Sequence, residues 1–385
     1  MDFELTEQQS IFRDQVRGLA ERHLTTGALE RAHDSRYPFA IARLFAEKGL
    51  LGITISEADG GHGGTLMDAV IAIEQVALVC PRSADVVQSG NFGPLRTFTE
   101  HATPEQKKRF LPKFLAGQAI VALGMTEAEA GSAATDLATT ARPEGTGYRV
   151  TGGKVFTTNS LDAELFLVYV RFGPGTGGIG SVLIERGAPG FTLGKPNRYM
   201  NGEEWSPLHF DDVFVPPENV LLGPGGFKKQ MAGFNAERIG NAARSLALGE
   251  FAFERARDYA ATRRQFGRAL CEFQGIQWKF ADMRVRLDAG RLLLYRAAVN
   301  ADRGLPSAME TSIAKAFCNQ AGFDLCNESM QVMGGTGYSS ETLVEYCFRK
   351  CRGWQIAGGS NEMMRNRIAE GVFDRRFSQR APKPT

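Results

Sequence analysis

The sequence predicts a multidomain α+β protein of 385 residues, in which a helical segment, a β segment and a second helical segment follow one another. Between Arg142 and Gly226 lie eight of the 16 prolines and 16 of the 44 glycines, a density that long helices do not tolerate. On both sides of this stretch, apolar residues recur at steps of three and four, as on one face of a helix. At about 150 residues per domain, the length allows two or three domains. We place them at 1–119, 120–226 and 227–385.

The first segment is predicted to be a series of helices that end at Gly, Pro or polar residues. Asp2 or Thr6 can cap the first helix. Thr103 is a suitable N-cap for a later helix, because Pro104 then takes the first helical position. The apolar face of the first helix is expected to carry Ile11, Phe12, Val16 and Leu19. Further helices are expected at 37–51, 66–79, 83–100 and 104–117.

The middle segment is predicted to be a β domain. Two strand-like runs, 148–151 and 154–158, flank Gly152 and Gly153, which is typical of a hairpin with a two-residue turn. Further strands are expected at 165–172, 180–185 and 191–193.

The last segment is predicted to be a helical bundle, because its apolar stripes are long and regular. One stripe, sustained for about six turns, consists of Phe273, Ile276, Phe280, Met283, Leu287 and Leu294. A second long helix is expected from Ser307 to Met333, where Gly334 follows, and shorter helices at 341–352 and 361–373. Such stripes form protein cores far more often than cofactor sites.

The composition argues against several functional classes. Lys and Arg total 45 against 43 Asp and Glu, a net charge of +2, which supplies no basic surface for nucleic acid or an anionic membrane. The longest apolar run is the six residues Leu165 to Val170, whereas a membrane-spanning helix needs about 20. The first ten residues carry acids where a secretory signal would carry Lys or Arg. We therefore expect a cytoplasmic enzyme.

The cysteines and histidines do not form a metal-binding pattern. The six cysteines, at positions 80, 271, 318, 326, 347 and 351, make no C-x-x-C. The five histidines, at 23, 33, 62, 101 and 209, are far in sequence from the late cysteines. We expect reduced thiols packed in cores and no metal.

The sequence lacks the common nucleotide and hydrolase motifs. It has no G-x-G-x-x-G after a strand, no phosphate-binding P-loop, no H-E-x-x-H and no G-x-S-x-G. Four other segments carry hydroxyl, basic or glycine residues that core packing alone does not explain. They lie at 125–132, 155–159, 263–267 and 331–338. Taken singly, each is explained by turn chemistry, a hairpin, a basic surface loop or a helix C-cap.

Taken together and in order, these segments resemble the acyl-CoA dehydrogenase family. The matching motifs are T-E-x-x-A-G-S at the start of the β domain, R-x-x-F-G, Q-x-x-G-G-x-G-Y and I-A-G-G-S-N-E. The resemblance covers nearly the whole chain. It implies the fold of that family, with an N-terminal helical domain, a central β-barrel-like domain and a C-terminal four-helix bundle. It also implies FAD as cofactor and a homotetramer in which two subunits build each flavin site.

The resemblance also implies roles for individual residues. On the β-domain side, the FAD contacts would come from Met125, Thr126, Gly131, Ser132, Phe156 and Thr158. The pyrophosphate and adenosine of a neighbouring subunit's FAD would be met by Arg263, Gln265, Phe266, Gln331 and Gly335, and the opposite portion by Ser360 and Glu362. An Arg beside glycine backbone suits a phosphate group.

The family's reaction needs a base for the α-proton and a group that polarises the thioester carbonyl. Many relatives carry the base as glutamate in a late Y-E-G-T stretch, but this chain has Gly358 there. Isovaleryl- and long-chain-type relatives carry it instead on an earlier helix before an arginine. Glu237, which precedes Arg238, fits that position. The backbone N–H of Gly358 can still polarise the carbonyl. The acyl-CoA would also contact Ser132, Phe234, Arg238, Ala357 and Gly359, and the small residues at 357 and 358 leave room for a branched or bulky acyl chain.

Three departures from the family pattern separate this chain from many relatives. Ala128 and Ala133 stand where the family usually has proline and aspartate, and Phe156 stands where many relatives have tryptophan. We expect an acyl-CoA dehydrogenase that passes its electrons to an electron-transfer flavoprotein. The alternatives are a relative with altered chemistry, such as a desulfinase or a flavin oxygenase, and a non-catalytic subunit of a hetero-oligomer.

Overall fold

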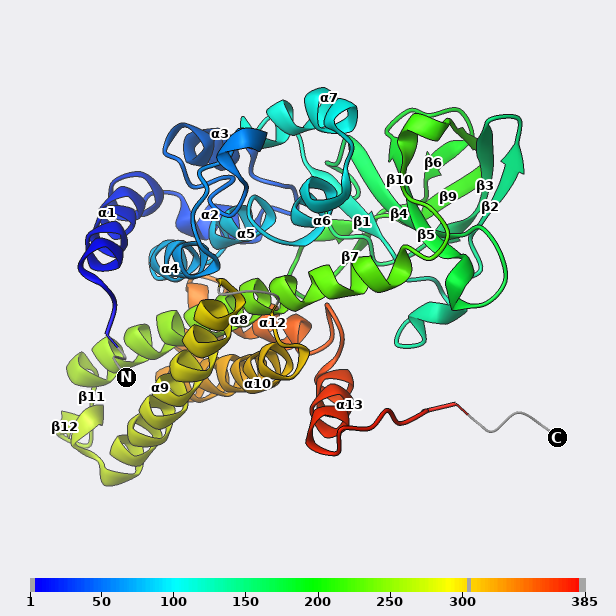
Figure 1. Cartoon of the computed structure of the whole chain (residues 1–385). Helices are drawn as coiled ribbons and strands as arrows, with labels where there is room; N and C mark the ends of the chain where they lie inside the picture. Colours follow the sequence, from blue (N-terminus) through cyan, green and yellow to red (C-terminus); the bar gives the residue numbers. More distant parts are fainter. Residues whose placement is uncertain (1–3, 303–305, 381–385) are drawn as a thin grey trace.

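The computed structural model describes residues 4–302 and 306–380 and shows the predicted order of helices, sheet and helices. The early helices lie beside the sheet, and the late helices lie below both (Figure 1). The larger of two core clusters takes buried side chains from all three parts, for example Val70, Phe166 and Leu246. The three parts therefore pack on one another through apolar contacts.

From residue 4 onward, the N-terminal part contains seven α-helices, most of them near their predicted positions. Thr6 caps the first helix in a capping box with Gln9, and Thr103 caps the seventh; Asp2 lies outside the described residues. Ile11 is exposed, so the prediction that it shares the buried face of Val16 is wrong. The helices are α1 Glu7–Leu24, α2 Ala28–His33, α3 Phe39–Glu47, α4 Leu66–Ala77, α5 Ala84–Ser89, α6 Gly93–His101 and α7 Pro104–Leu115.

The single helix predicted at 83–100 is in fact two helices, α5 and α6, and the break has a clear physical cause. Gly93 has φ +64°, a left-handed conformation that glycine adopts without strain. A Cβ on Gly90 would lie 2.5 Å from Leu51 Cδ2, so the chain packs closely there. The break brings the backbone of Gly93 against the side chain of Glu237 on a later helix.

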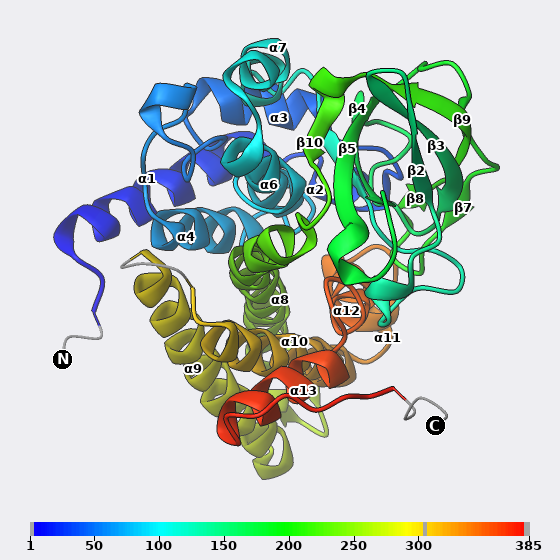
Figure 2. The same ribbon diagram turned by 45° about the vertical axis from the view of Figure 1, so that its right-hand side comes forward.

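The middle of the chain forms an eight-stranded mixed sheet with the order β10-β5-β4-β2-β3-β9-β6, and β1 pairs with β4. Most ladders are antiparallel, but β1 and β4 run parallel from Val121↔Leu165 to Gly124↔Val168. Figure 2 shows the sheet beside α6 and above the late helix α12 Leu343–Trp354. The strands are β1 Val121–Gly124, β2 Thr140–Glu144, β3 Gly147–Lys154, β4 Leu165–Arg171, β5 Ile179–Glu185, β6 Phe191–Leu193, β9 Leu208–Val215 and β10 Val220–Leu222, with a small separate pair β7 Asn197–Arg198 and β8 Glu204–Trp205.

The predicted turn at Gly152 and Gly153 is wrong. Strand β3 runs through both glycines, and the hairpin turn lies earlier, between β2 and β3, where Gly145 has φ +58°. The glycine at 152 is needed for a different reason, because a Cβ there would lie 2.7 Å from Thr139 Cα. The register with β9 shifts at this point, between Val150 and Gly152.

The C-terminal part is built on α8 Phe227–Thr262, a helix of 36 residues and hence about 54 Å long. Its closest helix partner, α10 Ala308–Met333, approaches at Gly322, where a Cβ would lie 2.2 Å from Ser245 O. The predicted stripe of α9 is largely confirmed, with Met283, Leu287 and Leu294 buried. The remaining elements are α9 Gln274–Asp302, α11 Gly335–Tyr338, α12 Leu343–Trp354, α13 Asn361–Val372 and the hairpin β11 Arg264–Gln265 and β12 Arg268–Ala269.

All six cysteines are free thiols, and all but Cys271 are buried. Within residues 4–302 and 306–380, no group of His, Cys, Asp and Glu side chains is arranged to hold a metal ion. No helix in the described ranges combines the length and the apolar character that a membrane span requires.

Candidate active site

Glu237 lies in the first third of α8, where the helix passes the break between α5 and α6. Its Oε1 accepts a hydrogen bond of 2.7 Å from Gln88 Nε2 on α5. Its Oε2 is buried and has no hydrogen-bond partner of ordinary geometry among the described residues, although the backbone N–H of Gly93 lies close enough to the carboxylate to lower its pKa. A Cβ on Gly93 would lie 3.3 Å from this atom, so only a glycine keeps the approach free. One oxygen of the carboxylate is therefore held in place, and the other is available to a ligand.

The surroundings of Glu237 favour its protonated form. Burial raises the pKa of Glu237 to about 7, although the hydrogen bond from Gln88 and the charge of Lys315 act in the opposite direction. A carboxylate with a pKa near neutrality is half deprotonated at the pH where it would have to accept a proton. Glu237 thus has the ionisation behaviour that a general base needs.

The loop that follows α12 carries Gly358. Lys315 on α10 holds this loop by hydrogen bonds to two backbone carbonyls. Lys315 Nζ donates hydrogen bonds to Gly359 O at 2.8 Å and to Trp354 O at 3.3 Å. The lysine side chain is buried, and burial lowers its pKa to about 7, with a further lowering by Arg238. Gly358 has φ +66°, and a Cβ there would lie 3.5 Å from Asn241 Nδ2. Asn241 is one helical turn beyond Glu237, so the loop and the carboxylate are neighbours.

The two expected acyl-CoA contacts on α8 flank Glu237. Arg238 is buried, donates from Nη1 to Asn235 Oδ1 at 2.6 Å, and has an Nε with no partner in the described chain. Phe234 is half-buried and packs against the smaller of the two core clusters. The remaining expected contacts in the 357–360 loop, Ala357 and Gly359, are exposed.

The sheet brings together the two β-domain segments that the sequence singled out. The backbone N–H of Val155 donates to Thr126 O at 2.8 Å, which joins segment 125–132 to the end of β3. Beneath them, the buried Lys154 Nζ donates to Glu127 Oε1 at 2.6 Å and to Met125 O at 3.3 Å. Met125 and Thr126 are half-buried, while Gly131 and Ser132 are exposed.

Phe156 forms an aromatic platform beside this segment. It has φ +56°, and its ring packs 4.6 Å from the ring of Trp205 while 57% of the residue stays exposed. Thr158 is exposed and pairs with Trp205 through an isolated β-bridge. An open ring face with exposed hydroxyls at Ser132 and Thr158 fits the flat ring system and the polar edge of a flavin. The residues present therefore fit FAD on this side.

Three of the other expected FAD residues, Arg263, Gln265 and Phe266, lie at the far end of α8. Arg263 caps the C-terminal end of α8, about 39 Å along the helix from Glu237. Figure 1 shows the β11–β12 hairpin at the opposite end of α8 from the sheet. Gln265 and Phe266 on this hairpin are exposed, Phe266 by 94%. Gln331 and Gly335, at the junction of α10 and α11, are also exposed, and Ser360 caps α13 with Glu362 in its first turn.

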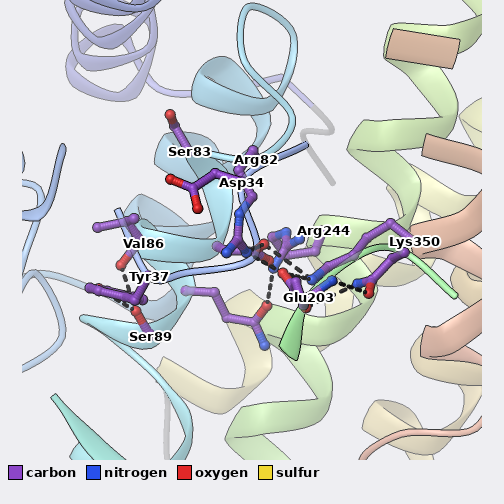
Figure 3. Close-up of polar contacts among 12 residues, drawn as sticks. Asp34, Tyr37, Arg82, Ser83, Val86, Ser89, Glu203, Arg244 and Lys350 are labelled. Atoms are coloured by element: carbon purple, nitrogen blue, oxygen red, sulfur yellow. Dashed lines mark hydrogen bonds and ion pairs between the residues drawn. The ribbon is translucent and has the colours of Figure 1, made fainter. Parts of the chain in front are cut away.

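A buried network of charged side chains, drawn in Figure 3, is linked to Glu237 through the side chain of Gln88. Gln88 Oε1 accepts a hydrogen bond of 3.0 Å from Arg244 Nη1, so one glutamine contacts both Glu237 and Arg244. Arg244 also contacts Asp85, which binds Arg82 at 2.7 Å and Lys350 at 3.1 Å. The charged members of this network, which we call the buried charge cluster, are Asp85, Arg82, Arg244, Lys350 and Glu203.

The sequence singled out Glu237 and Gly358 as candidates but not the polar side chains around them, which are Gln88 and Lys315, and Arg244 on the other side of Gln88. Gln88, Lys315 and Arg244 each stand alone in a run of apolar or small residues, as in I-A-K-A-F and N-A-A-R-S-L-A-L. A single polar residue inside a buried stretch of helix is the signal that points to such positions. Their partners lie as far as 156 residues away in the chain, so the sequence alone does not name them.

Comparisons with known proteins agree with this architecture. The N-terminal, middle and C-terminal domains of the acyl-CoA dehydrogenases match residues 6–118, 122–213 and 224–373. A curated relative from Clostridium acetobutylicum, "Acyl-CoA dehydrogenase, short-chain specific", is 34% identical over 378 residues, which cover 97% of this chain and 100% of the relative. A 3-sulfinopropanoyl-CoA desulfinase from Paraburkholderia xenovorans is 31% identical over 386 residues, with coverage of 98% and 99%.

A solved structure of glutaryl-coenzyme A dehydrogenase in its glutaryl-CoA complex superposes with a TM-score of 0.93 at 27% identity, covering 99% of this chain and 98% of that one. The domain matches, the curated relatives and the similar fold all indicate one family, and it is the family whose motifs occur in the sequence. The chain belongs to the acyl-CoA dehydrogenase family.

Proposed function

We propose that the protein catalyses the FAD-dependent α,β-dehydrogenation of an acyl-CoA thioester to the trans-2-enoyl-CoA. The observation that carries this proposal is the carboxylate of Glu237, with one oxygen held by Gln88 and the other buried and free. Family membership alone does not require a base at this position. The raised pKa of Glu237, about 7, supports the role of proton acceptor.

In this reaction Glu237 Oε2 takes the α-proton, and the β-hydrogen leaves with its electron pair. The backbone N–H of Gly358 donates to the thioester carbonyl and stabilises the charge that develops on its oxygen. Lys315 keeps this N–H in place through the carbonyls of Gly359 and Trp354. Partial burial of Glu237 raises its pKa and so favours its action as a base. FAD, when bound, supplies the acceptor for the hydride.

FAD would be held by residues from two subunits. Met125, Thr126, Ser132, Phe156 and Thr158 of one subunit would contact the flavin half, because they form one connected surface on the sheet. The residues around Arg263 lie about 39 Å along α8 from Glu237, so we infer that they do not contact the FAD that serves this Glu237. We propose that a second copy of the chain supplies Arg263, Gln265, Phe266, Gln331 and Gly335, with Ser360 and Glu362 completing the site. Electrons would then pass to an electron-transfer flavoprotein, as the sequence resemblance implies.

The function is tested by anaerobic mixing of the FAD-loaded protein with a panel of acyl-CoA thioesters. At least one acyl-CoA is expected to bleach the flavin absorbance and to be recovered as its enoyl-CoA. The panel should contain straight, branched and carboxylate-bearing acyl groups of similar length. Recovery of FAD with no bleaching by any member would contradict the proposal and favour a non-catalytic subunit.

The desulfinase relative favours a second candidate, in which the same site breaks the C–S bond of 3-sulfinopropanoyl-CoA and, with one water molecule, gives propanoyl-CoA and sulfite. The two functions give different products from the same assay. Free sulfite without an enoyl-CoA product would support the desulfinase, whereas an enoyl-CoA with reduced flavin would support the dehydrogenase.

A homo-oligomer is supported by an exposed apolar stripe on α9. Trp278, Val285 and Leu292 follow one another at seven-residue spacing, so they lie on the same face of the helix, and all three are exposed in the single chain. Replacing Trp278 and Leu292 by Glu is expected to reduce the mass measured by light scattering after gel filtration, and to release FAD. Ile11→Glu, an equivalent change on α1, should leave the mass unchanged. A wild-type protein that is monomeric with FAD bound would contradict the two-subunit site.

A further inference from the structure

We propose that Gln88 is a positioning residue for the base Glu237, and that Arg244 acts on Glu237 only through Gln88. Arg244 fixes which end of the Gln88 amide faces Glu237, and the amide in turn directs the incoming proton to Glu237 Oε2. This inference rests on the proposed function, because it describes how the chain orients the base of that reaction.

The side-chain amide of Gln88 lies between two groups of opposite hydrogen-bonding character. Its Oε1 accepts a hydrogen bond of 3.0 Å from Arg244 Nη1, and its Nε2 donates one of 2.7 Å to Glu237 Oε1. A guanidinium has only donors, and an ionised carboxylate has only acceptors. The reversed amide would place its NH₂ group against the guanidinium and its oxygen against the carboxylate, and would lose both bonds. Arg244 therefore determines that Gln88 presents a donor to Glu237.

Arg244 can fix the amide because its own position is fixed. Only 1% of its side chain is exposed, and it also contacts Asp85, which lies three residues before Gln88 on α5. Residues three apart in a helix lie on the same face, so α5 contacts the guanidinium at two points. Asp85 is in turn bound by other members of the buried charge cluster (Figure 3). The orientation of the amide thus depends on packing between the N-terminal and C-terminal parts of the chain.

The donor on Oε1 determines where Glu237 takes up a proton. A carboxylate oxygen that already accepts a bond from an amide N–H is the less favourable site for a proton, so the proton goes to Oε2. The same bond holds the carboxylate in one orientation and favours its ionised form. The charge of Arg244 polarises the amide and strengthens this bond. Loss of the donor from Gln88 should therefore loosen the carboxylate and raise the pKa of Glu237.

Other groups packed around Glu237 also affect its ionisation. Helix α10 contributes Lys315, whose charge lowers the pKa of Glu237, and the backbone N–H of Gly93 at the start of α6 acts in the same direction. Arg238, the next residue on α8, contributes to lowering the pKa of Lys315 to about 7. Lys315 therefore titrates in the same range as Glu237. A change at position 88 leaves these three residues in place, so a shift of the pH profile reports on the amide.

The first test is the pH dependence of flavin reduction in FAD-loaded Gln88→Met, a side chain of similar length without hydrogen bonds. The rate rises with pH as the base ionises, so a raised pKa should move the midpoint to higher pH, by about one unit for one lost bond to a charged group. The plateau rate should fall about 10-fold, because the carboxylate is less well oriented.

Gln106→Met is the matched control for loss of a buried glutamine. Gln106 on α7 is also buried, and its Nε2 donates to the backbone carbonyls of Glu218 and Val220. This variant should lose stability and keep the midpoint of the wild type. A purely structural role of Gln88 would give the same result in both glutamine variants and would overturn the proposal.

A double-mutant cycle tests whether Arg244 acts through Gln88. Arg244→Met alone is expected to move the midpoint in the same direction as Gln88→Met, because the amide is then free to turn. In the Gln88→Met background, the same change should move the midpoint no further. Equal shifts in both backgrounds would show that Arg244 acts directly through its charge, and would overturn its assigned role. Asp85 keeps Arg82 and Lys350 as partners in both Arg244 variants.

Gln88→Glu covers the case that the Met variant does not fold, since it keeps the size of the side chain and can still accept from Arg244. Its carboxylate offers no N–H to Glu237, so the midpoint should again move to higher pH. An unmoved midpoint in the folded Gln88 variants would overturn the positioning role.

The titration is also followed without turnover. The infrared band of the protonated Glu237 carboxyl, identified by its loss in Glu237→Gln, is recorded against pH in the FAD-loaded wild type and in Gln88→Met. The band should persist to higher pH in the variant, and identical titrations would contradict the role of Gln88. A protein that no acyl-CoA bleaches would overturn the proposed function, while the infrared titration would still decide whether Gln88 controls Glu237.

Discussion

Replacing Glu237 by glutamine is expected to slow flavin reduction by a bleaching acyl-CoA by about three orders of magnitude, the range over which a general base contributes. The glutamine keeps the size of the side chain and can still bond to Gln88, so the packing against Gly93 is preserved. FAD content and melting temperature should therefore stay close to those of the wild type. Stopped-flow absorbance under anaerobic conditions measures the rate directly.

Two further measurements separate loss of a base from general damage. In the wild type, the rate should rise with pH through about 7, because the pKa of Glu237 is raised and only the carboxylate accepts a proton. At pH 6 about a tenth of the carboxylate remains, so the rate should be about tenfold below its plateau. Glu105→Gln, on the exposed side of α7, is the control and should change neither the rate nor its pH profile. Full activity in Glu237→Gln would show that another residue takes the proton.

Replacing Lys315 by methionine is expected to lower kcat by about 10- to 100-fold, because a small misplacement of a catalytic group costs this much. The change removes the hydrogen bonds to Gly359 O and Trp354 O that hold the Gly358 loop. Gly359 O loses its side-chain donor, whereas Trp354 O keeps the hydrogen bond of 2.7 Å from Asn319 Nδ2, and the free energy of unfolding should fall by about 1–3 kcal/mol. KM for the acyl-CoA should change less than kcat, since Lys315 acts on the loop and not on the CoA moiety.

The pH profile distinguishes this positioning role from a purely structural one. The charge of Lys315 lowers the pKa of Glu237, so without it the pKa of Glu237 should rise and the rate profile should move to higher pH. Lys108→Met, an exposed lysine on α7, provides the control for loss of a positive charge. A Lys315→Met protein with reduced stability and an unmoved pH profile would leave Lys315 with only a structural role.

Much of the fold could be predicted because its signals are local. The N-caps Thr6 and Thr103 and the 3.6-residue periodicity of α9 depend on residues a few positions apart, and the structure confirms them. The predictions of secondary structure were wrong where contacts with a segment distant in sequence determine the backbone conformation. Gly152 was expected in a turn, but it is required because Thr139 packs against its backbone. The helix predicted at 83–100 divides at a glycine that packs on Leu51.

The same distinction applies to the site. Glu237 and Gly358 could be chosen because motifs of the family mark both positions. Gln88, Lys315 and Arg244 could not, because their importance comes from contacts across the fold, such as that between Gln88 and Glu237 over 149 residues. A lone polar residue in an apolar helix indicates that a partner exists. It does not tell which residue the partner is.

Helix α8 carries Glu237 near its beginning and ends beside Arg263. If the proposed two-subunit site is correct, a lesion at one end of this helix damages the subunit's own active site, and a lesion at the other end damages its neighbour's. Two inactive variants, one altered at each end, would then restore some activity when mixed within one oligomer. A one-residue insertion between the ends would turn them by about 100° relative to each other and so disturb both sites through a single change. Evolution of this helix is therefore constrained in length as well as in sequence.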